Sequence, residues 1–236
     1  MKNNIEKYVK KSSKNTNLYF LYNSKRVVIK DPLPEHVDLQ SILKKIERLI
    51  PEHFLYNVDA MYVGLYQEFE DRGINALYKD GILYISSEQD NDEDMIDDIV
   101  HEIAHAFEEV YPVYLYGDGK IEDEFLKKRM SFGFLMNYEG FKIERDLLIS
   151  IEYSEELDQI LLNDIGYDKI WPLTSELFIN PYAITSLREY LATGFEEYFL
   201  GERSFLKEIS PSIHEKITEL ENIENIEEKE NPYYAL

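Results

Sequence analysis

The stretch MIDDIVHEIAHAFEEVY (95–111) contains three residues of types that bind a metal ion and activate water. His101 and His105 are four residues apart, and on a helix such positions share one face with Cβ atoms about 5–6 Å apart. Two imidazoles at this spacing can bind one zinc ion at about 2.0–2.1 Å, and Glu102 lies close enough to act as general base on a water at the metal. The spacing predicts a hydrolytic site with one Zn²⁺ per chain. The alternative is a chance pairing of two histidines.

A third ligand must come from elsewhere, because catalytic zinc sites use three protein ligands and one open position. The chain has no cysteine, so a carboxylate on a later helix is expected. The stretch SLREYLATGFEEYFLG (186–201) offers Glu189, Glu196 and Glu197. Glu189 is favoured because Ala192, one turn further on, is small enough for a close approach to the first helix. The other histidines are predicted to be surface residues or packing contacts: His36, His53 and His214.

An acidic run before the motif begins like a calcium-binding loop, with Asp90, Asp92 and Asp94 at alternate positions. The turn position carries Met95 where such loops need glycine, and the twelfth position is His101 where they need glutamate. The run is therefore predicted to be the start of a helix.

The helix that carries the motif is expected from about residue 92 to 110, ended by Pro112. Its predicted buried face consists of the apolar residues at helical spacing: Met95, Ile96, Ile99, Val100, Ile103, Ala104 and Phe107.

Further elements are expected on both sides of this helix. Strands are predicted as a pair at 18–29, at 59–66, and on either side of a turn at 79–81 within 76–86. Helices are predicted at 38–49, over most of 121–160, at 186–200 and from 212, with 173–186 as a connecting segment.

The composition excludes some function classes. A net charge of −22 disfavours binding to nucleic acid or to an anionic membrane surface. No apolar run is long enough to span a bilayer, and no apolar segment of the kind found in signal peptides follows the basic start. The product is therefore expected to be cytoplasmic as synthesised. Release by lysis or by non-classical export is left open. The oligomeric state is left open.

Two stretches together resemble a known family. HEIAHAFEEVY (101–111) and YAITSLREYLATGF (182–195) are similar to the catalytic domain of anthrax lethal factor and the related Pro-Pro endopeptidases. In that family a tyrosine precedes the glutamate ligand by seven positions, as Tyr182 precedes Glu189 here, and Ala192 and Phe195 complete the pattern. Residues 76–129 also look like uncharacterised phage or mobile-element peptidases.

The resemblance implies roles for five residues. His101, His105 and Glu189 would bind zinc, Glu102 would be the general base, and Tyr182 would stabilise the oxyanion or donate a proton. It also implies an α+β zincin-like fold, mostly helical, with a small mixed sheet whose edge strand flanks the active-site helix. The strand GILYIS (81–86) is the expected edge against which an extended substrate pairs.

The chain departs from the family pattern in two places. Glu189 follows His105 by 84 residues (189 − 105), which points to an insertion at about 140–175 beside the cleft. Thr193 stands where a carboxylate could have supported the site. We expect residues 1–60 to form an N-terminal subdomain or extension, and residues 61–236 to form the catalytic domain.

The leading hypothesis is a zinc-dependent endopeptidase that acts on a peptide or protein substrate. The first alternative is a zincin-like binding or structural module without catalysis. A further alternative is an acidic partner-binding protein whose helix binds no metal. The strong negative charge favours basic or neutral peptides without identifying a substrate.

Overall fold

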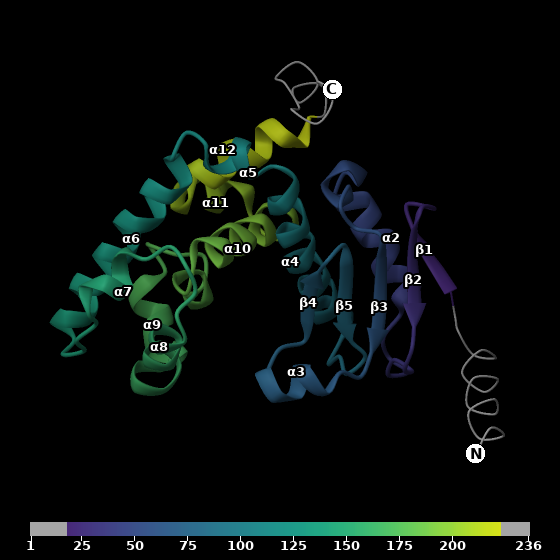
Figure 1. The fold of residues 1–236 in the computed structure, drawn as a ribbon, viewed down its shortest axis with the longest axis horizontal. Helices are drawn as coiled ribbons and strands as arrows, with labels where there is room; N and C mark the ends of the chain where they lie inside the picture. The colour runs from purple at the N-terminus through teal and green to yellow at the C-terminus, as the bar shows by residue number, and fades with distance from the viewer. Residues whose placement is uncertain (1–17, 223–236) are drawn as a thin grey trace. The chain divides into compact units, whose positions relative to one another are not determined.

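The described part of the chain begins with a five-stranded sheet, which is followed in the sequence by a long helix (Figure 1). The computed structural model describes residues 18–222. The expectations for the first residues of the chain and for its acidic end from 223 lie outside this range. Within it, no helix combines the length and the apolar composition that a bilayer span requires.

The chain divides into two compact units between Phe107 and Glu108. This division falls inside helix α4 (Asp92–Val110). The strands on either side of residue 60 pair with each other in one sheet, so the described part of the N-terminal region is built into the first unit.

The sheet of the first unit is mixed and has the strand order β1-β2-β3-β5-β4 (Figure 1). β1 and β2 form an antiparallel hairpin, as predicted for 18–29, and β4 pairs antiparallel with β5. The two central pairings, of β2 with β3 and of β3 with β5, are parallel. The strands are β1 (Leu18–Leu21), β2 (Lys25–Ile29), β3 (Ala60–Gly64), β4 (Ala76–Lys79) and β5 (Ile82–Ser86).

The edge beside β5 is occupied by β4, so the prediction that GILYIS forms the sheet edge was wrong. The turn between these strands makes them a hairpin: Asp80 and Gly81 have φ values of 51° and 79°, the left-handed pair that favours a tight turn. Because β5 pairs with β3 on its other side, its hairpin partner β4 becomes the edge.

One face of the sheet is buried and the other is partly exposed, because side chains alternate along each strand. Helix α2 (Leu39–Leu49) connects β2 to β3, and Asp38 caps it by accepting bonds from the amides of Gln40 and Ser41. The 3₁₀ helix η1 (Glu52–Leu55) and helix α3 (Gln67–Arg72) complete the connections. The buried face of the sheet consists of side chains at most 1% exposed: Val27, Met61, Val63, Leu83 and Ile85.

Helix α4 has the predicted bounds and the predicted buried face. All seven apolar residues of that face are at most 3% exposed. Asn91 accepts a hydrogen bond from the amide of Asp94 at 2.9 Å, which caps the first turn of the helix. The acidic run is therefore a helix start, as predicted.

The second unit is helical. Helix α6 ends at Tyr138, so the prediction of helix through 121–160 was partly wrong: Gly140, at φ 92°, ends the run, and shorter helices follow. The predicted connecting segment contains the end of α9 and the 3₁₀ helix η3. The helices are α5 (Pro112–Tyr116), α6 (Lys120–Tyr138), α7 (Arg145–Ile149), α8 (Glu155–Gln159), the π-helix η2 (Ile160–Ile165), α9 (Tyr167–Thr174), η3 (Pro181–Ile184), α10 (Leu187–Leu200), α11 (Arg203–Ile209) and α12 (Pro211–Glu221).

A largely buried lysine on α6 bonds to the backbone of two other segments of the second unit. The ammonium of Lys128, on α6, donates to the carbonyl of Leu177 at 2.7 Å and to that of Ile209, and it lies over the rings of Phe178 and Tyr190. Burial lowers the pKa of Lys128 from 10.5 to about 8.

The lowered pKa of Lys128 predicts a pH-dependent stability. Between pH 8 and 10.5 the unfolded chain holds a proton that the folded chain has released, so the free energy of unfolding rises with pH in this window. The rise should amount to roughly 2–3 kcal/mol, since one pKa unit corresponds to about 1.4 kcal/mol. Urea unfolding at pH 7.5 to 10 measures it, and comparison with Lys128→Met isolates it. Parallel curves for the two proteins would contradict this assignment.

Candidate metal centre

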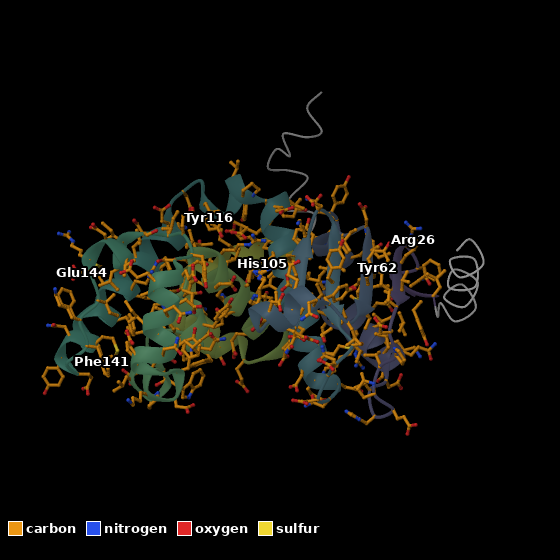
Figure 2. The ribbon with its side chains drawn as sticks, turned by 60° about the horizontal axis from the view of Figure 1, so that its bottom comes forward. Arg26, Tyr62, His105, Tyr116, Phe141 and Glu144 are labelled. Carbon is orange, nitrogen blue, oxygen red and sulfur yellow. The ribbon has the colours of Figure 1, made fainter. Side chains whose placement is uncertain are left out.

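The three motif residues converge on one side of α4. The Nε2 atoms of His101 and His105 lie 3.1 Å apart, and the two rings meet edge to face at 83°. One ligand atom from each of these histidines and from Glu102 lies within 4.8 Å of the other two. His105, labelled in Figure 2, and Glu102 are each 7% exposed. The structure therefore brings together the residues that the motif predicted.

The distance between the two imidazole nitrogens fits a shared metal ion. Two ligands held at about 2.0–2.1 Å in tetrahedral geometry lie about 3.3–3.4 Å apart. The observed 3.1 Å is within a few tenths of an ångström of that separation. A neutral imidazole offers one nitrogen lone pair, so the pair can present two donors to one ion.

Glu102 is anchored by the edge strand. Its Oε2 accepts a hydrogen bond from the backbone amide of Tyr78, on β4, at 2.5 Å. In an antiparallel pair the backbone groups of alternate residues point away from the partner strand. Asn75 already bonds to Ser86 on the β5 side, so the groups of Ala76 and Tyr78 point toward the free edge. The edge strand thus flanks the motif helix, as predicted, although it is β4.

Glu189 lies in the first turn of α10, in the second unit. Ser186 caps this helix by accepting a hydrogen bond from the Glu189 amide at 3.1 Å. Ala192 is fully buried, and its approach to the motif helix stays a prediction. Thr193 stands where a carboxylate could have supported the site. Its hydroxyl donates to the carbonyl of Glu189 at 2.9 Å and so stabilises the backbone of this turn.

An ion pair that the sequence did not reveal ties this turn to the end of the motif helix. Arg188 Nε lies 3.3 Å from Glu108 Oε2, and the hydroxyl of Tyr116, labelled in Figure 2, donates to the same carboxylate at 2.5 Å. Burial raises the pKa of Glu108, and the nearby charge of Glu189 raises it further, while Tyr116 and Arg188 oppose the rise. Glu108 follows His105 by three positions, so the i, i+4, i+7 stripe on α4 was the signal that could have identified it.

The other two candidate carboxylates lie at the far end of α10. Glu197 accepts a hydrogen bond from the backbone amide of Glu202 at 2.7 Å. This bond serves the end of the helix, three turns from the position of Glu189. Glu196 is likewise in the last turns of α10.

Tyr182 lies on η3, just before α10. Asn180 caps η3 by accepting from the Ala183 amide at 3.0 Å, and the Thr185 hydroxyl donates to the Tyr182 carbonyl at 2.8 Å. Its side chain is 39% exposed. These two bonds hold the backbone of η3 around a tyrosine that is partly exposed.

Comparison of the chain with models of protein families, with curated proteins and with solved structures finds no match. The functional argument therefore rests on the arrangement of the chain's own residues.

Proposed function

We propose that this protein is a zinc-dependent endopeptidase with a zincin-like arrangement. One observation carries the proposal: on one helix, two imidazole nitrogens lie 3.1 Å apart, and the carboxylate between them in sequence is held by the backbone of the adjacent edge strand. If the two histidines were paired by chance, there would be no reason for the backbone of β4 to hold the carboxylate of Glu102 beside them.

His101 and His105 would hold the ion, with Glu189 as the third ligand. When bound, zinc would act as a Lewis acid that makes a water more acidic and polarises the carbonyl of the scissile bond. Arg188, the neighbour of Glu189, pairs with Glu108 on the motif helix, and this link supports the choice of Glu189.

Glu102 would take the proton of the attacking water and pass it to the leaving amine. The Tyr78 amide bonds to Oε2, which helps to fix the rotamer of the side chain, so that the carboxylate is positioned before a proton is transferred. Burial of this carboxylate at 7% exposure excludes competing water.

The free edge of β4 would align the substrate. An extended peptide that adds to this edge would bond to the outward backbone groups of Ala76 and to the carbonyl of Tyr78, because the Tyr78 amide donates to Glu102. The Tyr78 amide is already directed at Glu102, so this register would bring a peptide bond next to the general base. Tyr182 would donate its hydroxyl to the oxyanion that develops on the carbonyl.

Zinc content tests the proposal directly. The purified protein should hold one zinc per chain, and His101→Ala or His105→Ala should remove most of it, because the remaining ligands bind weakly. His36→Ala is the matched control, because His36 is exposed and its Nε2 lies 2.9 Å from the carbonyl oxygen of Asp90. Elemental analysis measures the metal, and a peptide screen with the loaded protein separates an enzyme from an inactive module. Stoichiometric zinc in both motif variants would rule the site out.

The third ligand has its own test. Glu189→Ala should weaken zinc binding by about 10-fold to 100-fold or more, the scale on which even supporting residues of metal sites act. Glu196→Ala and Glu197→Ala should leave the affinity unchanged, because Glu197 is engaged at the end of α10. Competition with a chromophoric chelator measures all three. A loss confined to Glu196 or Glu197 would reassign the ligand.

A further inference from the structure

The inserted segment is bonded directly to the turn that carries Glu189. The carbonyl of Ile151 accepts a hydrogen bond from the Leu187 amide, at the start of α10, at 2.9 Å. Helix α9, also in this segment, packs against η3, which carries Tyr182. Phe141 and Glu144, labelled in Figure 2, lie near the start of the segment. The insertion is therefore part of the surroundings of both Tyr182 and Glu189.

Within the insertion, two tyrosines converge on one carboxylate. The Tyr153 hydroxyl donates to Asp158 Oδ2 at 2.9 Å, and the Tyr167 hydroxyl donates to Asp158 Oδ1 at 3.1 Å. Tyr182 lies on η3, against which α9, the helix of Tyr167, packs, and it is near enough to Tyr167 to influence the pKa of that residue. Burial raises the pKa of Tyr167, and the charges of Asp158, Tyr182 and Tyr153 raise it further, in that order. We call these four residues the Asp158 cluster.

The composition of the Asp158 cluster suits a cation. Among residues 18–222, no lysine or arginine forms an ion pair with Asp158. Each of its oxygens accepts one tyrosine hydroxyl and keeps a second lone pair. A cation over an aromatic ring is attracted by the ring face, and most strongly where water is partly excluded.

The exposure of the Asp158 cluster argues against a purely structural role. Tyr153 is 54% exposed and Tyr182 is 39% exposed, so their rings are accessible to another molecule. Tyr190, by contrast, is fully buried and bonds to Glu124 and Ser210 in the core of the same unit. Tyrosines that serve only to pack a core are expected to resemble Tyr190.

We propose that the Asp158 cluster is a specificity site that binds a lysine or arginine side chain of the peptide substrate beside Tyr182. This inference rests on the proposed peptidase function. The substrate cation would lie against the ring of Tyr153 and donate to the carboxylate of Asp158, while its backbone pairs elsewhere. The net charge of −22 adds a general attraction for cationic peptides, which the test has to separate from this local recognition.

Matched peptides test the proposal. The peptides are fluorogenic and come in pairs: one member carries lysine at a given position, and the other carries the neutral analogue norleucine at the same position. Each position is varied in turn, and kcat/KM is compared within each pair. The wild type should prefer lysine at one position by about 5-fold to 30-fold, the range expected for a partly desolvated cation at aromatic rings. Asp158→Asn should reduce this preference to about 2-fold or less, with little change for the norleucine peptide. Asp164→Asn, an exposed acid of the same insertion, should keep the preference.

The same peptides should be measured for binding to the Glu102→Gln variant, so that recognition is read without turnover. Retention of the preference in Asp158→Asn, or its equal loss in Asp164→Asn, would overturn the site. Cleavage without any lysine preference would overturn it while the peptidase function stands. Selective binding by Glu102→Gln without any cleavage by the zinc-loaded wild type would retain the cluster and reject the peptidase function. Neither selective binding nor cleavage would reject both.

Discussion

Glu102→Gln is expected to abolish most turnover while zinc content and fold remain. The amide has the same shape as the carboxylate, and its oxygen can still accept the hydrogen bond from the Tyr78 amide. It cannot take a proton from water. Loss of general base catalysis alone should lower kcat by about 10²–10⁴. The measurement is kcat on a cleaved peptide, with zinc stoichiometry and thermal unfolding recorded for the same sample.

A matched control separates this effect from a change in the charge of the helix. Glu93→Gln removes one carboxylate from the exposed first turn of α4, two turns from the motif. It should leave kcat within about 2-fold of the wild type, because exposed charges act weakly at such a distance. If Glu102→Gln also stayed within that range, the base would have to be another residue.

The helix that carries the motif could be predicted because its local signals agree. An apolar stripe at helical spacing, an acidic first turn and Pro112 after its end all indicate the same bounds, and α4 has them. The geometry of His101 and His105 follows from helix periodicity alone. These features are local, so no knowledge of distant contacts was needed.

The edge of the sheet could not be predicted in the same way. Strand order depends on which strands pair, and apolar composition does not distinguish an inner strand from an edge strand. The turn at Asp80 and Gly81 correctly indicated a hairpin, but the hairpin alone did not tell which of its strands would face the parallel strand β3. β5 pairs with β3, so β5 is an inner strand of the sheet and β4 is the edge strand.

The surroundings of Glu189 depend on contacts across long sequence separations. Arg188 meets Glu108 over 80 positions (188 − 108), and Ile151 meets Leu187 over 36 (187 − 151). No periodicity marks either pair. The predicted ligand could therefore be chosen from its motif and resemblance, and the insertion from the length of the gap, whereas the ion pair and the bond between Ile151 and Leu187 emerged only from the fold.

Tyr182→Phe is expected to lower kcat by about 10²–10³, the scale for losing one donor to an oxyanion. The variant keeps the ring, and η3 is capped by Asn180 and Thr185 through bonds that do not involve the Tyr182 hydroxyl, so the backbone should be unchanged. KM and zinc content should change little, because this hydrogen bond forms only as charge develops on the carbonyl oxygen. Tyr138→Phe, which removes the hydroxyl of a side chain that is 86% exposed on α6, is the control and should retain full activity. Steady-state kinetics of the two variants on one peptide decide the matter. An unchanged kcat for Tyr182→Phe would assign Tyr182 to packing and to the Asp158 cluster, and the oxyanion would need another donor.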